Sequence, residues 1–360
     1  MNTPPAFHYA LLDWFDRHGR KDLPWQTGRS PYAVWISEIM LQQTQVATVI
    51  PYFQRFMVRF PDVAHLAAAA EDEVLSAWSG LGYYARARHL QAAARLMVER
   101  HQAQVPQDES SLLALPGIGR STAGAILSLG HGMRAAILDG NVKRVLSRHR
   151  AVAGWPGLPA VSRELWHLAE QLTPSERVAD YNQAMMDLGA TLCVRRKPLC
   201  HVCPVQAGCQ AFQSGQVDEL PEARPARAIP IRACFMLIVW RTGGEVLLEK
   251  RPPVGLWGGL WTFPEFPTQN ALTDWCQDKH LNPHSLRYLP TRHHRFSHYQ
   301  LDYTPTVLSA PWVYPSAIAE TTDWRWFKCE DSIGVPAPVR QLLDEWPLLT
   351  IHPADVPTVP

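Results

Sequence analysis

The chain has 360 residues, enough for two domains, and its composition (46% hydrophobic, 19% charged) is that of a globular protein rather than a disordered or fibrous one. The net charge of +1 combines a mildly basic part through Gln210 with a mildly acidic remainder, which permits polyanion binding without proving it. No apolar run is long enough to cross a bilayer, and no secretory signal is present. We therefore expect no membrane association.

The first 210 residues carry apolar side chains mostly at helical spacing. Ser30-Pro31 is a helix start signal, an N-cap residue followed by proline at the first helical position, and it predicts a helix over 32–50 that Pro51 ends. Because few stretches alternate with the period of a strand, we predict an all-α lobe over 1–212. Its further helices are expected at 7–17, 71–79, 84–99, 121–128, 142–148, 163–172 and 182–192.

A proline-rich stretch, 213–231, reads as a linker. Beyond it the pattern changes to strands separated by turn residues, with Thr242-Gly243-Gly244 as a hairpin signal. This change predicts a second domain of α+β type over 232–360. Its strands are expected at 235–240, 246–248, 260–263, 299–307 and 324–327, and its helices at 271–279 and 339–346.

Four cysteines lie close together, in the pattern C-x6-C-x2-C-x5-C, at Cys193, Cys200, Cys203 and Cys209. Four thiolates this close can surround one metal centre, and an all-cysteine set is typical of an iron–sulfur cluster. Zinc is the alternative, but structural zinc sites more often pair two C-x2-4-C knuckles. Disulfides are disfavoured, because the gathering of four cysteines without a secretory signal indicates a reducing compartment.

Two further segments carry candidate chemistry. Leu115-Pro116-Gly117-Ile118-Gly119-Arg120 lies between two predicted helices, where bare backbone amides at a helix N-terminus can bind phosphate. Read alone, it is equally an ordinary helix–helix turn. Shortly after it, Asp139 falls at the N-cap of the next predicted helix, where its carboxylate is either a structural cap or a reactive group.

The order of these features resembles the helix-hairpin-helix DNA glycosylases with an iron–sulfur loop, and specifically the MutY-type adenine DNA glycosylases. The resemblance implies a mainly α, six-helix-barrel-like catalytic lobe with the hairpin at 111–130, an iron–sulfur helical module at 193–209 and a C-terminal Nudix-like α+β domain. The segments that carry it are 23–25, Ser37-Glu38-Ile39-Met40-Leu41-Gln42-Gln43-Thr44, 78–84, the hairpin and Asp139 segments, 182–190 and the cysteine loop.

The resemblance also implies the chemistry. Cleavage of the bond between adenine and its sugar needs a proton donor for the base and a carboxylate for the positive charge on the sugar. Glu38 lies among apolar residues of its helix, where burial would raise its pKa, so we assign it as the acid and Asp139 as the carboxylate. Asn141 is expected to help hold sugar or base. Endonuclease III, the nearest cousin, has a Schiff-base lysine where Ser121 stands, so no lyase of that type is expected.

The family's contacts with DNA map onto several further residues. Adenine must leave the duplex to react, and Gln43 and Tyr83 are the residues expected to insert into the gap. The hairpin and basic side chains near it are expected to contact phosphates, which positions DNA without reading its sequence. These residues are Gly117, Gly119, Arg120, Arg86 and Arg88, with Arg195, Arg196 and Lys197 of the cluster loop. Ser121, where some relatives have a tyrosine, is counted among the DNA-binding residues without a defined role for its hydroxyl.

In the C-terminal domain, Gly255–Pro264 matches the segment shared with Nudix proteins, but the glutamate-rich metal-binding helix of a working Nudix hydrolase is missing. The resemblance implies a domain kept for recognition. Phe296, Ser297 and His298 correspond to the loop that senses 8-oxoguanine, with the Ser297 hydroxyl accepting the N7–H of the oxidised base.

The sequence therefore predicts a monofunctional DNA glycosylase of base excision repair, with one [4Fe–4S] cluster, that removes adenine opposite 8-oxoguanine or guanine in double-stranded DNA. We expect a monomer in the cytoplasm, associated with the nucleoid if the source is bacterial, or in the nucleus or mitochondrion if it is eukaryotic. Two alternatives stay open: a bifunctional glycosylase and lyase like endonuclease III, and a non-catalytic iron–sulfur protein that binds DNA.

Overall fold

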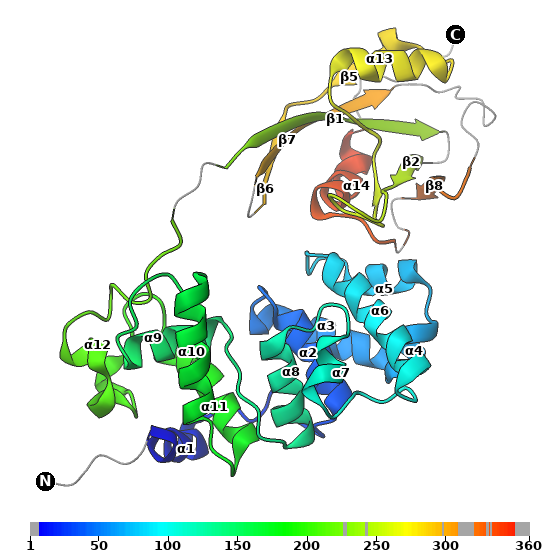
Figure 1. The fold of residues 1–360 in the computed structure, drawn as a ribbon. Coiled ribbons are helices and arrows are strands. Elements are labelled where there is room, and N and C mark those ends of the chain that lie inside the picture. The colour runs from blue at the N-terminus through cyan, green and yellow to red at the C-terminus, as the bar shows by residue number, and fades with distance from the viewer. Residues whose placement is uncertain are drawn as a thin grey trace, which may run out of the picture. The chain divides into compact units, whose positions relative to one another are not determined.

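The structure, a computed structural model, describes residues 7–225, 229–241, 244–296, 299–308, 320–328, 331 and 333–349. The chain forms two compact units. The first contains residues up to Ala69 and His89–Ala226, and the second combines Ala70–Arg88 with the chain from Arg227 onward. Figure 1 shows helices throughout the first unit and a sheet in the second.

The helices of the N-terminal part confirm the predicted all-α lobe. A short helix pair, α7 and α8, encloses the predicted hairpin, and α8 continues into a π-helical turn, η1 (Ile126–Gly130). Three of the helices, α4, α7 and α12, were not predicted. The helices are α1 (Phe7–His18), α2 (Pro31–Leu41), α3 (Val46–Arg59), α4 (Val63–Ala68), α5 (Glu71–Trp78), α6 (Ala85–Arg100), α7 (Glu109–Leu113), α8 (Arg120–Ala125), α9 (Gly140–His149), α10 (Pro159–Leu172), α11 (Val178–Thr191) and α12 (Gln210–Gln213).

The single helix predicted over 32–50 is wrong. α2 ends at Leu41 and α3 begins at Val46, so the chain breaks at Gln43, whose φ of 59° is left-handed. Neither glycine nor proline marks this break, and the apolar spacing runs across it because both helices bury apolar residues. Pro51, expected to end the helix, lies exposed inside α3 at the cost of one backbone hydrogen bond.

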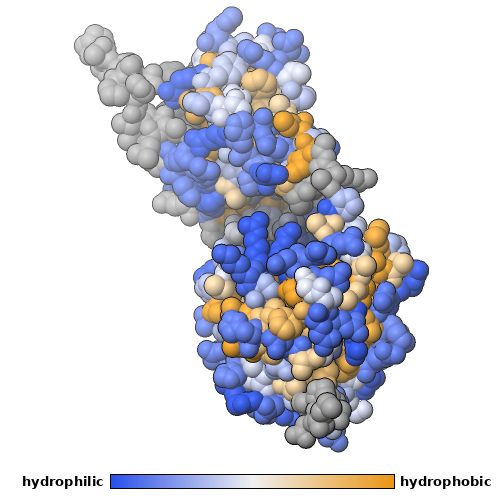
Figure 2. Space-filling model, turned by 90° about the vertical axis from the view of Figure 1, so that its left-hand side faces the viewer, coloured by the Kyte–Doolittle hydropathy of each residue, from blue (hydrophilic) through white to orange (hydrophobic). Residues whose placement is uncertain are grey.

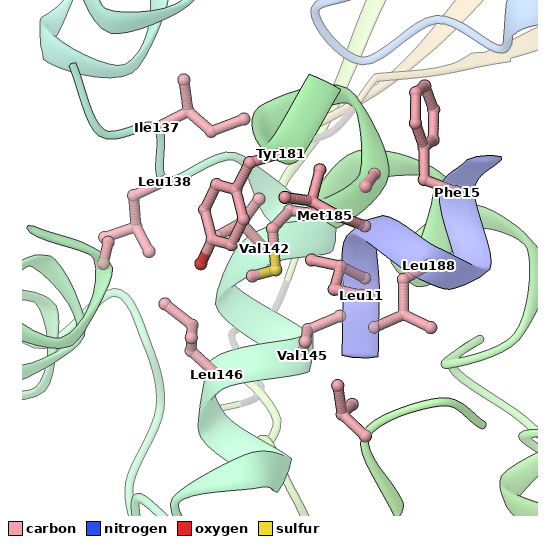
Figure 3. Packing of buried hydrophobic residues seen from close by; sticks show 14 of the residues in the cluster. Leu11, Phe15, Ile137, Leu138, Val142, Val145, Leu146, Tyr181, Met185 and Leu188 are labelled. Carbon is pink, nitrogen blue, oxygen red and sulfur yellow. The ribbon is translucent and has the colours of Figure 1, made fainter. Parts of the chain in front are cut away.

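The core of the first unit fixes helix α9, whose N-cap is Asp139. Val142, Val145 and Leu146 form its apolar face, and Figure 3 shows them among side chains from α1 and α11, including Met185. Each of these side chains is at most 2% exposed. Burying an aliphatic side chain stabilises a fold by about 1.5–3 kcal/mol. The packing of this face therefore fixes the position of the N-terminus of α9.

The second unit contains a mixed sheet in which β1 pairs with β7 in parallel and with β2 antiparallel. Leu237 and Val239 of β1 pack with α13 (Gln269–Asp278), while α14 (Ala337–Leu349) lies at the other face (Figure 1). The predicted α+β domain is thus confirmed, with three strands, β4, β5 and β6, added. The strands are β1 (Ile231–Arg241), β2 (Glu245–Lys250), β3 (Trp261–Thr262), β4 (Glu265–Phe266), β5 (Leu286–Tyr288), β6 (Arg292–Arg295), β7 (Gln300–Leu308) and β8 (Trp324–Lys328).

The visible face of the molecule is mostly hydrophilic, with smaller hydrophobic patches between (Figure 2). Within the described residues, none of the helices combines the length and the apolar character that a membrane crossing requires.

Candidate active site

Glu38 is held by a helix that is buried on nearly every side. Ser30 caps α2 by accepting a hydrogen bond from the backbone N–H of Ala33 at 3.1 Å, and Pro31 occupies its first position. Trp35 and Ile36, earlier in the same helix, are 0% exposed. Glu38 itself keeps an intermediate exposure, so part of its surface can meet a ligand.

The pKa of Glu38 is raised to about 8, first by burial and second by the negative charge of Asp139. Both causes disfavour the carboxylate, because a charge is costly away from water and beside a like charge. The carboxyl group is therefore mostly protonated at neutral pH. The prediction that burial raises this pKa is confirmed, and the contribution of Asp139 shows that the two acids lie near each other.

Asp139 is the N-cap of α9, as the sequence predicted. One carboxylate oxygen accepts a hydrogen bond from the backbone N–H of Val142 at 2.8 Å, and the other accepts one from the side-chain amide of Asn141 at 3.1 Å. Both bonds favour an anion, as does the positive end of the helix dipole. The surroundings of Glu38 thus favour the neutral carboxyl group, whereas those of Asp139 provide hydrogen-bond donors to a carboxylate.

Asn141 is itself oriented by Arg144, one helical turn further along α9. The guanidinium of Arg144 donates to the side-chain oxygen of Asn141 at 2.9 Å and to the carbonyl oxygens of Gly189 and Cys193, both at 2.7 Å. A side chain at Gly189 would place its Cβ 2.6 Å from Cβ of Asn141, so only glycine permits this approach. A series of hydrogen bonds therefore connects Asp139, through Asn141 and Arg144, to Cys193, the first cysteine of the cysteine loop.

The segment that leads into Asp139 is fixed by two polar side chains. The hydroxyl of Ser121 accepts a hydrogen bond from the backbone N–H of Leu138 at 2.9 Å. The amide of Asn182 donates to the carbonyl oxygen of Ala135 at 2.9 Å. Ser121, which the sequence left without a clear role, therefore holds the backbone at Leu138, the residue before Asp139.

The hairpin is a turn between two helices, as its sequence predicts. Gly117 has a left-handed φ of 79°, and a Cβ there would come within 2.9 Å of Cβ of His89. Gly119 is the N-cap of α8. Arg120 stacks on the ring of Trp166 and forms an ion pair with Glu170, so a phosphate would compete with a carboxylate for this guanidinium.

Gln43 and Tyr83, expected to insert into DNA, share an unusual backbone. Their φ angles are 59° and 49°, in the left-handed region that side chains other than glycine rarely adopt. Gln43 is exposed, and Tyr83 is 49% exposed. Strained backbone of this kind is concentrated at binding and catalytic positions.

Arg86 and Arg88 make protein contacts in this structure. Arg86 donates to the carbonyl oxygens of Leu81 and Gly82, both at 3.2 Å, and burial lowers its pKa to about 10. Arg88 donates to the carbonyl oxygen of Gly258. Arg86 thus shapes the loop that carries Tyr83, and a phosphate contact by either arginine stays a prediction.

The four cysteines line a single cavity together with apolar side chains such as Leu199 and Phe212. Burial raises the pKa of Cys203 to about 12, with smaller effects from the neighbouring thiols, so thiolates here need positive charge. Arg148 supplies some, with its guanidinium 3.5 Å from Sγ of Cys193. In the described part of the chain, no three His, Cys, Asp or Glu side chains are arranged to hold one metal ion.

The recognition loop is described only in part. Phe296 stacks on Tyr299 with ring centroids 4.6 Å apart, and its backbone N–H donates to the carbonyl oxygen of Tyr299 at 2.9 Å. Ser297 and His298, which connect these two residues, lie outside the described residues.

Arg144 and Arg148 are the main contributors that the sequence analysis missed. They follow Asn141 at helical spacing of three and seven residues, so a search for polar side chains on the face of Asn141 would have found them. Their partners on 189–220 are distant in sequence, and no local pattern indicates those contacts.

Comparison with known proteins agrees with this geometry. The profile of the HhH-GPD superfamily base excision DNA repair proteins matches residues 36–171, and that of the NUDIX domain matches residues 235–345. An adenine DNA glycosylase of Buchnera aphidicola (Acyrthosiphon pisum, strain APS) is 35% identical, over 96% of this chain and 98% of its own. The chain belongs to the adenine DNA glycosylases. The mouse adenine DNA glycosylase is 39% identical, over 83% of this chain and 69% of its own.

Two solved structures of DNA-repair enzymes share the fold of the helical part of this chain. A thermostable thymine-DNA glycosylase is 30% identical with a TM-score of 0.53, covering 58% of this chain and 95% of its own. Endonuclease III in a non-covalent complex with DNA is 23% identical with a TM-score of 0.50, covering 60% and 99%. At that identity the second likeness concerns the fold alone.

Proposed function

We propose that this glycosylase removes adenine from double-stranded DNA where adenine lies opposite 8-oxoguanine or guanine, and that it does so without cutting the strand. The observation that carries the proposal is the pairing of a buried, protonated Glu38 with a hydrogen-bonded Asp139. One acid that donates a proton and one that stays anionic are what cleavage of a glycosidic bond to a purine requires.

The reaction begins when adenine rotates out of the duplex. Glu38 then protonates the adenine ring, at N7, which turns the base into a good leaving group. As the bond breaks, the sugar becomes positively charged, and the carboxylate of Asp139 stabilises that charge. Water then adds to the sugar carbon that adenine has left, and the proton it releases returns to the carboxylate of Glu38. Asn141 and Arg144 keep the carboxylate of Asp139 in place through the hydrogen bonds described above.

The absence of a second, strand-cutting activity rests on Ser121. A lyase of the endonuclease III kind needs an amine that attacks the sugar. The hydroxyl of Ser121 occupies that sequence position and already accepts a hydrogen bond from Leu138. Retention of Glu38 and Asp139 in one site disfavours the third possibility, a protein that binds DNA without reacting.

Recognition of the base opposite adenine is assigned to the hairpin around Phe296. The ring of Phe296 is held by Tyr299 and His294, in position to wedge beside a base. Ser297, the next residue, would accept the N7–H that 8-oxoguanine carries and guanine lacks. One such hydrogen bond contributes about 0.5–1.5 kcal/mol of discrimination.

A [4Fe–4S] cluster fits the cysteine loop. Such a cluster takes one thiolate on each iron, so its four ligands surround a cavity instead of converging on one ion. Cys193, Cys200, Cys203 and Cys209 line a cavity of this kind, with a guanidinium beside one thiol. The cluster would hold the loop in shape; zinc is the alternative.

The function is tested with duplexes that contain adenine opposite 8-oxoguanine, opposite guanine or opposite thymine. We expect strand breaks with the first two only, and only after alkali, which cleaves the abasic product. Breaks without alkali would support the lyase, and no breaks after alkali would support a binding protein.

The metal is tested by analysis of the purified protein. We expect about four irons per chain and a visible absorption band of the iron–sulfur type. One zinc per chain and no visible band would overturn the cluster and leave the glycosylase proposal untouched.

A further inference from the structure

The segment Ala70–Arg88, although it lies early in the chain, forms one compact unit with the C-terminal sheet. Three contacts fix it there. The hydroxyl of Tyr84 donates to the carbonyl oxygen of Val335 at 3.0 Å, the ammonium of Lys250 lies 2.8 Å from the carboxylate of Asp72, and Arg88 donates to the carbonyl oxygen of Gly258. Tyr83, expected to insert into DNA, lies between Asp72 and Tyr84 in the sequence, so residues on both sides of it are fixed by these contacts.

The loop Gly255–Gly259 is the element that Arg88 reaches. A Cβ on Gly259 would lie 2.9 Å from the carboxylate of Glu71 and 3.5 Å from the side chain of Leu75, so the loop lies directly on helix α5. Trp257, in its middle, has a left-handed φ of 55° although it is not glycine. A strained residue persists only where its surroundings hold it in place.

The side chain of Trp257 is held by contacts with other aromatic rings. Trp257 is 9% exposed, and its ring lies 5.8 Å from the ring of Phe296, measured between centroids. Phe296 stacks in turn on Tyr299, and the guanidinium of Arg232 lies 5.0 Å from the centre of the Tyr299 ring. Trp257 is thus the link between the loop and the recognition hairpin.

We propose that Trp257 is a positioning residue that couples the recognition hairpin at Phe296 to the segment that carries Tyr83, through the loop Gly255–Gly259. The inference rests on the proposed function, because it assigns opposite-base sensing to that hairpin. When the hairpin seats on 8-oxoguanine, Trp257 transmits its position through Gly258 and Arg88 to the residues around Tyr83. Insertion next to the flipped adenine then responds to the identity of the opposite base.

The first test perturbs each end and reads the other, by hydrogen exchange on the full-length protein without DNA. Trp257→Ala should speed exchange about tenfold in peptides covering 80–88 and 294–303. Arg88→Gln, which weakens the far end of the loop, should speed exchange at 294–303 as well. Trp275→Ala is the matched control, because that ring stacks on Trp324 instead of Phe296, and it should change neither peptide.

Two outcomes of this exchange experiment overturn the coupling. One is unchanged exchange at 294–303 in a folded Arg88→Gln protein, and the other is unchanged exchange at 80–88 in Trp257→Ala or, should that variant not fold, in Trp257→Leu. Neither readout depends on the substrate, so the coupling can fail while the proposed function stands.

The second test measures single-turnover excision of adenine opposite 8-oxoguanine and opposite guanine. Trp257→Ala should reduce the ratio of the two rates about tenfold, mainly through slower excision opposite 8-oxoguanine, and Trp257→Phe should restore most of it. Equal losses on both substrates would mean a merely structural role. A wild-type protein without any preference would contradict the assignment of opposite-base recognition to the hairpin around Phe296 instead, and the exchange results would still decide the coupling.

Discussion

The two sites of this protein are built in different ways. The carboxylate of Asp139 is held by directed hydrogen bonds from Val142 and Asn141, and Asn141 is held in turn by Arg144. Around Phe296, the side-chain contacts are between rings: Phe296 stacks on Tyr299, packs at a tilt against Trp257 and lies edge to face with His294. Hydrogen bonds fix a charge to within a few tenths of an ångström, as bond breaking requires, whereas stacked rings hold a surface that must accept a base.

The comparison predicts different consequences of mutation. Changes in the polar site should slow excision whatever base lies opposite adenine. Changes in the aromatic site should alter mainly the preference for that base.

The largest effect is expected for Glu38→Gln. The amide keeps the shape of the side chain but cannot donate a proton to adenine, so single-turnover excision should fall about 10³-fold opposite both guanine and 8-oxoguanine. Binding to a duplex with a non-cleavable adenine analogue should change little, which serves as the control for folding. Turnover within a factor of ten of the wild type would refute the assignment of the acid.

Asp139→Asn should reduce excision about 10²-fold, because the charge that stabilises the sugar is lost. Asparagine is as good an N-cap as aspartate, so the melting temperature should stay within a few degrees. The two effects separate the reactive role from the structural one. A variant that melts far lower and reacts normally once folded would show that Asp139 is only a cap.

Arg144→Gln should slow excision about tenfold, since Asn141 and the carboxylate of Asp139 lose their orientation. The loss should be the same opposite guanine and 8-oxoguanine. Arg150→Gln, an exposed arginine at the end of the same helix, is the matched control and should leave the rates unchanged. A loss of rate opposite only one of the two bases would contradict the prediction that the polar site acts independently of the base opposite adenine.

Ser297→Ala should have the smallest effect and a selective one. Removing a single hydrogen bond to N7–H should lower the preference for 8-oxoguanine over guanine by roughly threefold to tenfold. Excision opposite guanine should not change. Equal preference in the variant and the wild type would remove Ser297 from the recognition contact.

The sequence predicted the parts of this protein that local patterns encode. The N-cap at Asp139 and the turn at Gly117–Gly119 follow from neighbours in the chain, as does the burial that raises the pKa of Glu38, whereas the further rise caused by Asp139 does not. The break at Gln43 did not, because no glycine or proline marks it and the apolar spacing continues through it.

The contacts made by distant residues were also beyond the sequence. Arg144 meets Gly189 and Cys193 some 45 residues on, and Arg88 meets Gly258 after 170 residues. From the sequence, the positive charge of each arginine is equally consistent with a contact to phosphate. Only the fold shows that a carbonyl oxygen is its partner.

Titration of Glu38 in the free protein tests the central claim most directly. Carbon NMR of the side-chain carboxyl, assigned by its absence in Glu38→Gln, should give a pKa near 8, so the group is protonated below that pH and loses its proton above it. In Asp139→Asn the pKa should fall, because a neighbouring negative charge is removed. A pKa of an ordinary glutamate, about 4.3, that Asp139→Asn leaves unchanged would contradict the account.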